Sequence, residues 1–199
     1  MNLKVWIDFV CPYCMLANKP LHEAIAGLDV QLDWMPFELR PEGEPPFRPE
    51  DEFIQNGWKH SVYPLAARLG VEMRLPAISP QPYTRLAFEG LQFAKQAGKT
   101  QDYGDAVLNA FFQRGRDIGN VDVLTAVAEE TGLAGDRFKA ALLSGEFRNA
   151  HAAALRSGRE IGIRAVPSVL IGNRVASGIP DPGMLRQVIE RELAAIRAR

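Results

Sequence analysis

The sequence has few residues that bind metals: two cysteines and three histidines in 199 residues. A structural zinc site usually needs four ligands, often two pairs of cysteines. Here there is a single pair of cysteines, and His22, His60 and His151 have no ligand spacing with one another. We therefore expect no metal site and assign the histidines no role.

Long hydrophobic runs and an excess of one charge are also absent. No apolar run approaches the roughly 20 residues that span a bilayer, and 23 basic residues nearly balance 24 acidic ones, for a net charge of -1. Neither a membrane nor a nucleic acid is therefore expected as a partner. The first residues, MNLKVWIDF, have no basic leader and no small-residue cleavage site, so we expect no signal peptide and a cytoplasmic location.

The two cysteines are present as Cys11-Pro12-Tyr13-Cys14, directly after an apolar run. Such a pair could be half of a metal site, a structural disulfide, two inert thiols or a redox pair. A disulfide that closes so short a loop stabilises little. In a reducing compartment an isolated pair is more often catalytic or metal-binding than structural. A redox pair is therefore the favoured interpretation.

The sequence around the pair predicts a strand, a helix and a strand. Residues 3–9 are rich in Val, Trp, Ile and Phe and indicate a buried strand, and residues 30–37 indicate a second one. Between them, residues 12–27 indicate a helix with Pro12 in its first turn and Pro20 as the cause of a kink.

The middle of the chain has a different texture. Residues 39–51 form a proline-rich, charged loop, and residues 51–162 have helical patterns throughout. Asp122 and Asp136 are expected to cap two of these helices. The phenylalanines are expected to pack in the core, namely Phe93, Phe111, Phe112 and Phe138. The helical block is expected to form one wall of a cleft.

The last part of the chain returns to a strand pattern. Residues 167–173 predict a strand, and residues 175–177 can pair back after a Gly-Asn turn as a short hairpin. Asp181 is expected to cap a final helix. The expected apolar face of that helix consists of Met184, Leu185, Val188, Ile189, Leu193 and Ile196.

Together these elements predict an α/β fold with one four-stranded mixed sheet. Neither end of the chain can bury its faces alone, so residues 1–40 and 163–199 are expected to form one domain. Residues 50–162 are expected to be an all-helical insertion into it.

Cys11 lies where the first predicted strand meets its helix. Unpaired N–H groups and the helix macrodipole stabilise a thiolate at that place, and thiolates are the attacking species in disulfide exchange. Cys14 lies one turn later on the same helix face and is expected to be less exposed. Cys11 is therefore the predicted nucleophile and Cys14 the predicted resolving thiol, with Pro12 and Tyr13 tuning the redox balance between them.

Val166 and Pro167 form the second half of the predicted site. If their strand runs antiparallel beside the first strand, they lie against the cysteines. An X–Pro bond there can be cis, and a proline leaves the neighbouring backbone free to pair with an extended peptide. The alternative is an ordinary trans proline that opens a strand, and these residues alone do not decide between the two.

Three stretches in order along the chain, FVCPYC, WMPFEL and GIRAVPSVLIGN, resemble the DsbA-type thioredoxin fold. More narrowly, they resemble its cytoplasmic FrnE-like branch, and the resemblance covers the whole chain, including the helical insertion. It implies a thioredoxin-like fold, a nucleophilic Cys11, a resolving Cys14 and a cis-proline at Pro167. On this basis the predicted substrate-binding residues are Pro12, Tyr13, Val166 and Pro167. No metal or resident cofactor is implied, and glutathione is a possible redox partner.

The sequence departs from the related families at one buried acid. Thioredoxins and periplasmic DsbA proteins often carry an acid six residues before the first cysteine, where this chain has Val5. Asp8 is the only acid nearby, and strand alternation would point residues 5 and 8 to opposite faces. Asp8 is therefore not expected to take the same role, and water could exchange protons with Cys14 instead.

Three classes of function are compatible with these features. The first is a thiol–disulfide oxidoreductase that acts on protein disulfides or dithiols or on glutathione. The second is a glutathione-dependent isomerase or transferase of the kappa or 2-hydroxychromene-2-carboxylate isomerase type, which resembles this chain in fold. Members of that type usually have Ser at the position of Cys11 and lack the second cysteine, so the presence of both cysteines favours the first class. The third is a non-catalytic protein-binding module.

Overall fold

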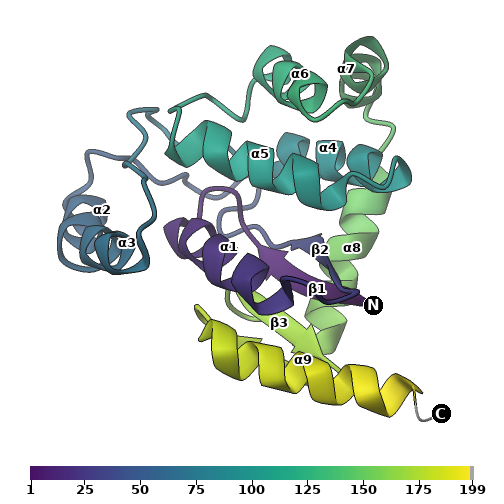
Figure 1. Ribbon diagram of the computed structural model, residues 1–199. Coiled ribbons are helices and arrows are strands. Elements are labelled where there is room, and N and C mark those ends of the chain that lie inside the picture. Colours follow the sequence, from purple (N-terminus) through teal and green to yellow (C-terminus); the bar gives the residue numbers. More distant parts are fainter. Residues whose placement is uncertain (198–199) are drawn as a thin grey trace.

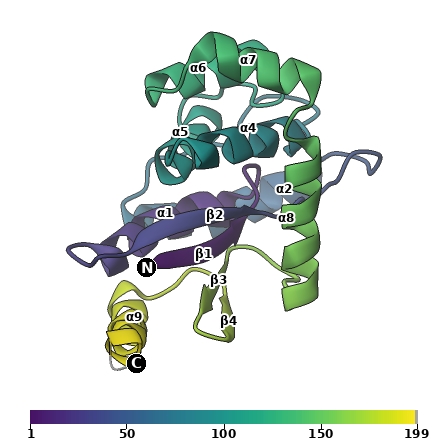
Figure 2. The same cartoon turned by 90° about the vertical axis from the view of Figure 1, so that its right-hand side faces the viewer.

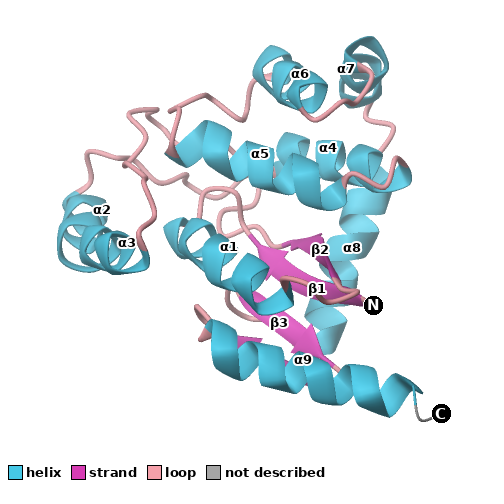
Figure 3. Cartoon of the chain, viewed as in Figure 1, coloured by secondary structure: helices cyan, strands magenta, loops and turns pink. Residues whose placement is uncertain are grey.

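A computed structural model describes residues 1–197, and a four-stranded sheet lies at the centre of this range (Figure 1; Figure 3). In spatial order its strands are β2 (Gln31–Pro36), β1 (Asn2–Ile7), β3 (Ser168–Ile171) and β4 (Arg174–Ser177). β2 runs parallel to β1, whereas β3 runs antiparallel to β1 and β4 antiparallel to β3. The two ends of the chain therefore form one mixed sheet, as the sequence predicts.

β1 is buried on both faces because it is a central strand. Leu3, Val5 and Ile7 point into the main core, whereas Trp6 packs with Met35 on the opposite face. Helix α1 (Pro12–Ile25) and helix α9 (Pro182–Arg197) cover the first face. Helix α8 (Arg148–Ile161) lies against the second, so that α9 and α8 are on opposite sides of the sheet (Figure 2).

The segment between β2 and β3 is mostly helical. In Figure 1 the pair α4 and α5 lies over the sheet, α6 and α7 lie above that pair, and α2 and α3 lie to the side of α1. Their bounds are α2 (Glu52–Gly57), the π-helical turn η1 (Trp58–Val62), α3 (Tyr63–Leu69), α4 (Arg85–Gln96), α5 (Thr100–Phe112), α6 (Val121–Glu130) and α7 (Gly135–Ser144).

Two predicted helix caps are wrong. Asn120, not Asp122, caps α6, because its side-chain oxygen accepts hydrogen bonds from the amides of Asp122 and Val123. Helix α7 begins one residue before Asp136 and has Ala134 at its N-cap position. Asn and Asp are nearly equivalent as caps, so composition could not select between Asn120 and Asp122. In α7 no side chain caps the helix, and Asp136 lies in its first turn.

The final helix is capped as predicted but buries only part of its predicted apolar face. Asp181 Oδ1 accepts a hydrogen bond from the Met184 amide at 2.8 Å. Leu185 and Ile189 are buried and Leu193 is partly buried, whereas Met184, Val188 and Ile196 are exposed. The helix contacts α1 and β3, and only one narrow stripe faces these neighbours.

One hydrophobic core extends from the sheet into the helical segment. Val5 of β1 belongs to the same cluster as Phe88, Phe111, Phe112 and Phe138 of the helices. Phe93 packs at the edge of this cluster and is partly buried. The division into residues 1–40 with 163–199 and residues 50–162 stays a prediction, and its last two residues, 198 and 199, lie outside the described part of the chain.

The close packing of α5 on β2 depends on Gly104. A Cβ atom at this position would overlap the indole of Trp34. We expect Gly104→Ala to lower the free energy of unfolding by about 1–3 kcal/mol, because the helix must move away from the strand. Chemical denaturation followed by circular dichroism would measure this change.

Gly57 provides the matched control. It is helical, and a Cβ there would have no heavy atom within 4 Å. Gly57→Ala should leave the stability unchanged or raise it by up to about 1 kcal/mol. Equal losses of stability in the two variants would contradict the assignment of the Gly104 effect to contact with Trp34.

Candidate active site

Cys11 ends the turn between β1 and α1. Its amide donates to the carbonyl oxygen of Asp8 at 3.0 Å, and it directly precedes Pro12, the first helical residue. A proline is tolerated at this position because the amide there would have no intrahelical acceptor. The Cys11 side chain is nearly buried but lines a cavity of about 300 Å³. The thiol is therefore reached through that cavity.

Cys14 lies one turn further along α1 and is fully buried. Its Sγ accepts a hydrogen bond from the backbone amide of Asp8 at 3.4 Å. Burial raises the pKa of the Cys14 thiol well above its ordinary value, and the neighbouring Cys11 raises it further. Both cysteines are free thiols. Cys14 is thus less accessible than Cys11, in the order that the sequence predicts.

Strand β3 brings Val166 and Pro167 to Cys11. The register pairs Ser168 with Trp6, so the residues that precede β3 lie beside the turn that follows β1. The carbonyl oxygen of Val166 is 3.9 Å from Cys11 Sγ, and the Val166–Pro167 peptide bond is cis. The two predicted halves of the site therefore lie side by side.

The cavity beside Cys11 is mostly apolar and has walls from different parts of the chain. Val10, Leu39 and Val166 line it near the cysteine. From the helical segment and the loop before it, the lining residues include Phe47, Phe53, Trp58 and Val62. The hydroxyl groups of Tyr13 and Ser61 are 2.8 Å apart and link the first turn of α1 to η1. The predicted substrate residues Pro12 and Tyr13 also line this cavity.

Asp8 is a residue of the site whose part sequence reasoning missed. β1 ends at Ile7, so the alternation of strand side chains does not extend to Asp8, which turns inward and is 1% exposed. Its Oδ2 accepts a hydrogen bond from the Leu39 amide at 2.7 Å. Burial raises the pKa of Asp8 to about 7, the negative charge of Glu38 adds to this rise, and the hydrogen bond from Leu39 opposes it.

The position of Asp8 matters because its backbone contacts Cys14 Sγ. A carboxyl group that changes charge near neutral pH thus lies beside the buried thiol, and its negative charge contributes to the raised pKa of Cys14. The sequence contained one signal for it: an acid enclosed by apolar residues in WIDFVC, three positions before the first cysteine.

The three histidines have partners outside this site. His22 forms an ion pair with Asp105, His151 lies 2.7 Å from Glu38, and the His60 ring contacts the Asn56 carbonyl group. Within residues 1–197, no group of three or more His, Cys, Asp or Glu side chains is arranged to hold a metal ion. No helix in this range is both long and apolar enough to cross a membrane.

Comparison with known families gives a match over nearly the whole chain. A family described as a DSBA-like thioredoxin domain matches residues 2–190. This chain belongs to that DSBA-like thioredoxin family. The predicted fold class, a thioredoxin-like α/β fold with a four-stranded mixed sheet, is therefore confirmed.

Other proteins are similar to this DSBA-like chain in sequence or in fold. The uncharacterized protein YwbO of Bacillus subtilis (strain 168) is 42% identical over 194 residues, which cover 96% of this chain and 97% of YwbO. The crystal structure of the probable DsbA oxidoreductase SCO1869 from Streptomyces coelicolor is similar with a TM-score of 0.80 at 20% identity, over 98% of this chain and 90% of that one. A structure of 2-hydroxychromene-2-carboxylate isomerase is similar with a TM-score of 0.79 at 18% identity, over 100% and 98% of the two chains. At these identities the solved structures establish the fold alone.

The raised pKa of Asp8 predicts a pH-dependent loss of stability. The folded state binds this proton more tightly than the unfolded chain, in which the pKa is near 3.8. Asp8 therefore lowers the free energy of unfolding progressively as the pH rises from about 4 to about 7, by up to about 4 kcal/mol. Asp8→Asn should be more stable than the wild type at about pH 8 and closer to it at about pH 5, as measured by urea unfolding.

Asp136→Asn is the control, because it removes the same charge at an exposed position. Its stability relative to the wild type should change little between the two pH values. If the difference between Asp8→Asn and the wild type is the same at both pH values, the protonation of buried Asp8 does not contribute to folding stability in this range.

Proposed function

We propose that this protein is a thiol–disulfide oxidoreductase that exchanges disulfides with protein thiols or with small thiols such as glutathione. The observation that carries the proposal is the unequal placement of its two cysteines. Cys11 lines an apolar cavity at the N-terminus of α1, and Cys14 is fully buried one turn behind it. A substrate disulfide can reach Cys11 but not Cys14, which is the arrangement that a nucleophile and a resolving thiol require.

The proposed reaction proceeds through a mixed disulfide. The Cys11 thiolate attacks one sulfur of a substrate disulfide, so a bond to Cys11 forms, the substrate S–S bond breaks, and the leaving sulfur departs as a thiolate that takes up a proton. Cys14 then loses its proton and attacks the Cys11 sulfur. This step forms the Cys11–Cys14 disulfide and releases the second substrate sulfur as a thiolate. Two electrons pass from the protein to the substrate, and the reverse sequence oxidises a substrate dithiol.

Asp8 is the proposed acceptor of the Cys14 proton, in place of the water considered from the sequence alone. Cys14 is buried and its pKa is raised, so its proton must pass to a nearby group before the thiol can attack. A carboxyl group whose pKa is about 7 is suited to accept and return a proton near neutral pH. The contact between the Asp8 backbone and Cys14 Sγ supports this role.

Val166 and Pro167 are proposed to hold the substrate next to Cys11. The Val166 carbonyl group is already in contact with Cys11 Sγ. Pro167 has no backbone N–H, so it does not form a hydrogen bond of its own where an incoming peptide would bind. An extended peptide bound here would place the side chain next to its reacting cysteine in the apolar cavity beside Pro12 and Tyr13. We therefore propose that apolar side chains next to the reacting cysteine favour a substrate.

Substitution of each cysteine tests the proposed exchange. Cys11→Ser should abolish exchange with an insulin-type protein disulfide or with oxidised glutathione, because it removes the nucleophile. Cys14→Ser should retain the first attack and accumulate a mixed disulfide with the substrate, which intact mass spectrometry would detect. Full activity of Cys11→Ser would end the proposal. Glutathione-dependent isomerisation that survives loss of Cys14 would support the isomerase alternative instead.

Phe53 tests the role of the apolar cavity. It lines the cavity but is 80% exposed, so its truncation should leave folding unaffected. Phe53→Ala should raise KM by several-fold for a peptide with an aromatic residue beside its disulfide, at roughly 1–2 kcal/mol of lost binding, and should affect oxidised glutathione less. Steady-state kinetics with both substrates would measure the difference.

The control is Leu143→Ala on α7, where another exposed apolar side chain lies outside the cavity. Its KM values should equal those of the wild type. A Phe53→Ala enzyme that handles both substrates as well as the wild type would remove the cavity from the proposal without affecting the roles of the cysteines.

A further inference from the structure

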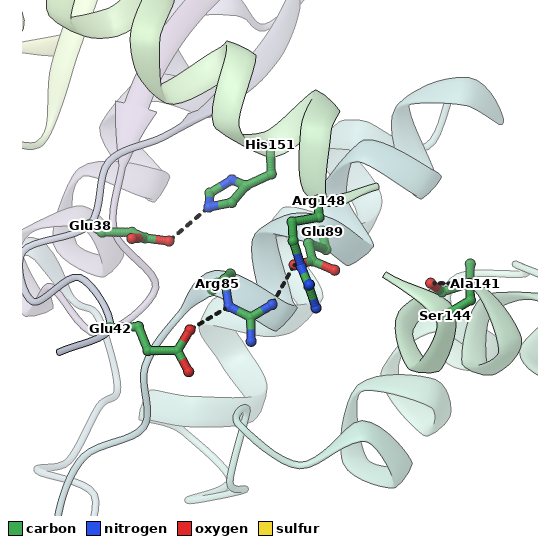
Figure 4. Close-up of polar contacts among 8 residues, drawn as sticks. All are labelled: Glu38, Glu42, Arg85, Glu89, Ala141, Ser144, Arg148 and His151. Carbon is green, nitrogen blue, oxygen red and sulfur yellow. Dashed lines mark hydrogen bonds and ion pairs between the residues drawn. The ribbon is translucent and has the colours of Figure 1, made fainter. Parts of the chain in front are cut away.

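Two buried ionisable side chains, Glu38 and His151, have no part in the exchange described above. The side chain of His151 on α8 is 3% exposed, and that of Glu38, two residues after β2, is 10% exposed. Their Nε2 and Oε1 atoms are 2.7 Å apart (Figure 4). Because a carboxylate only accepts hydrogen bonds, Nε2 is the donor. The ring of Phe88 stacks on the imidazole with centroids 5.7 Å apart, which fixes its orientation.

A short series of contacts leads from this pair to the buried cysteine. Glu38 is followed by Leu39, whose amide donates to Asp8 Oδ2 at 2.7 Å. The Asp8 amide in turn donates to Cys14 Sγ at 3.4 Å. The negative charge of Glu38 acts on Asp8 in the same direction as burial and favours its protonated form. Residues from the loop after β2, from α8 and from the turn after β1 are thus connected to Cys14.

The other charged groups nearby are compensated separately. Glu89 is fully buried, with Oε1 at 2.7 Å from Arg85 Nη1 and 3.9 Å from Arg148 Nε, and Arg85 Nε is 3.0 Å from Glu42 Oε2 (Figure 4). The carboxyl group of Glu89 therefore faces two guanidinium groups, whereas that of Glu38 is paired with an imidazole.

The remaining groups that face Glu38 or Asp8 are few. Arg159 and Arg164 line the same cavity of about 290 Å³ as Glu38, and neither forms an ion pair with it in the described structure. Thr84, just before α4, acts on Asp8 in the direction that lowers its pKa, and Cys11 lies in the same turn as Asp8. Glu38 is thus the nearby carboxylate whose charge acts on Asp8.

We propose that Glu38 and His151 form a positioning pair that controls the charge of Asp8, and through Asp8 the rate at which Cys14 resolves a mixed disulfide. His151 Nε2 donates to Glu38 Oε1 and holds the Glu38 side chain at the position from which its charge acts on Asp8. The ionised Glu38 repels negative charge on Asp8 and makes Asp8 a better acceptor for the proton of Cys14. This inference rests on the proposed function, because it concerns the resolving step of that exchange.

The pH dependence of the resolving step tests the proposal. In the wild type the single-turnover rate of mixed-disulfide resolution should rise with pH as Asp8 ionises. Glu38→Gln removes the repulsion, so Asp8 ionises more easily and the midpoint should move to lower pH by roughly 0.5–1 unit. His151→Phe should move it in the same direction, because the Glu38 side chain loses the hydrogen bond that holds its charge in place near Asp8.

His151→Gln is the matched control, because its amide nitrogen can take the place of Nε2 and donate to Glu38. It should restore the wild-type midpoint. The double variant Glu38→Gln/His151→Phe should shift the midpoint no further than Glu38→Gln alone, since both changes act through one charge. If His151→Gln behaves like His151→Phe, the imidazole acts only through packing and the proposal is wrong.

A second measurement separates this proposal from the proposed function. The protonation of Asp8 can be followed directly by isotope-edited infrared spectroscopy of its carboxyl group, with Asp8→Asn for assignment. This titration should shift downward in Glu38→Gln and His151→Phe and not in His151→Gln. An unshifted Asp8 titration in a protein that exchanges disulfides would overturn the positioning role alone. If the wild type exchanges no disulfides, the proposed function is wrong. The role of Glu38 and His151 in mixed-disulfide resolution is then wrong too, even if the titration of Asp8 shifts in the variants as expected.

Discussion

The antiparallel pairing of β3 with β1 is the contact on which the rest of the site depends. Neither half of the site is complete without it, because the cysteines follow β1 and Pro167 precedes β3. A slip of one residue would turn buried Val169 away from the core and move Val166 away from Cys11. On its other side β3 is aligned with β4, where the Ser168 hydroxyl group contacts the Ser177 hydroxyl group at 2.7 Å.

The strands and the helix of the cysteines could be predicted from local patterns. The meeting of Pro167 with Cys11 could be predicted only on the condition that its strand runs antiparallel to β1, an arrangement that the family resemblance supported. Features set by distant neighbours could not. Whether Asp8 lies in the strand or in the turn depends on where β1 stops, which sequence periodicity locates only approximately. The hydrogen bond that the Asp8 side chain accepts comes from Leu39, which lies three residues after the end of β2 and far from Asp8 in the sequence. The exposed half of α9 was mispredicted for the same reason: an apolar side chain such as Met184 is buried only if another element covers it.

The buried acids show that this part of the fold is not arranged for maximum stability. A carboxyl group in an apolar interior favours its neutral form, so Asp8 lowers stability at neutral pH relative to a neutral side chain of the same size. Glu89 is also fully buried, but its carboxyl group faces two arginines. Asp8 has no cationic partner among the groups that act on it, and it lies next to Cys14. Perturbed groups of this kind are concentrated at functional sites, where reactivity outweighs stability.

The fold alone does not select a reaction, since the structures of a probable DsbA oxidoreductase and of an isomerase are both similar to this one. Both kinds of chemistry could use one activated group at the start of α1. A second thiol that no substrate can reach contributes nothing to an isomerisation centred on the first. Cys14 becomes necessary only if a bond to Cys11 has to be broken by a thiol inside the protein. The proton of Cys14 then needs an acceptor, because solvent is excluded from that interior. In the proposed exchange the neighbouring carboxyl group of Asp8 would be that acceptor, so Cys14 and its surroundings, more than Cys11, distinguish between the two functions.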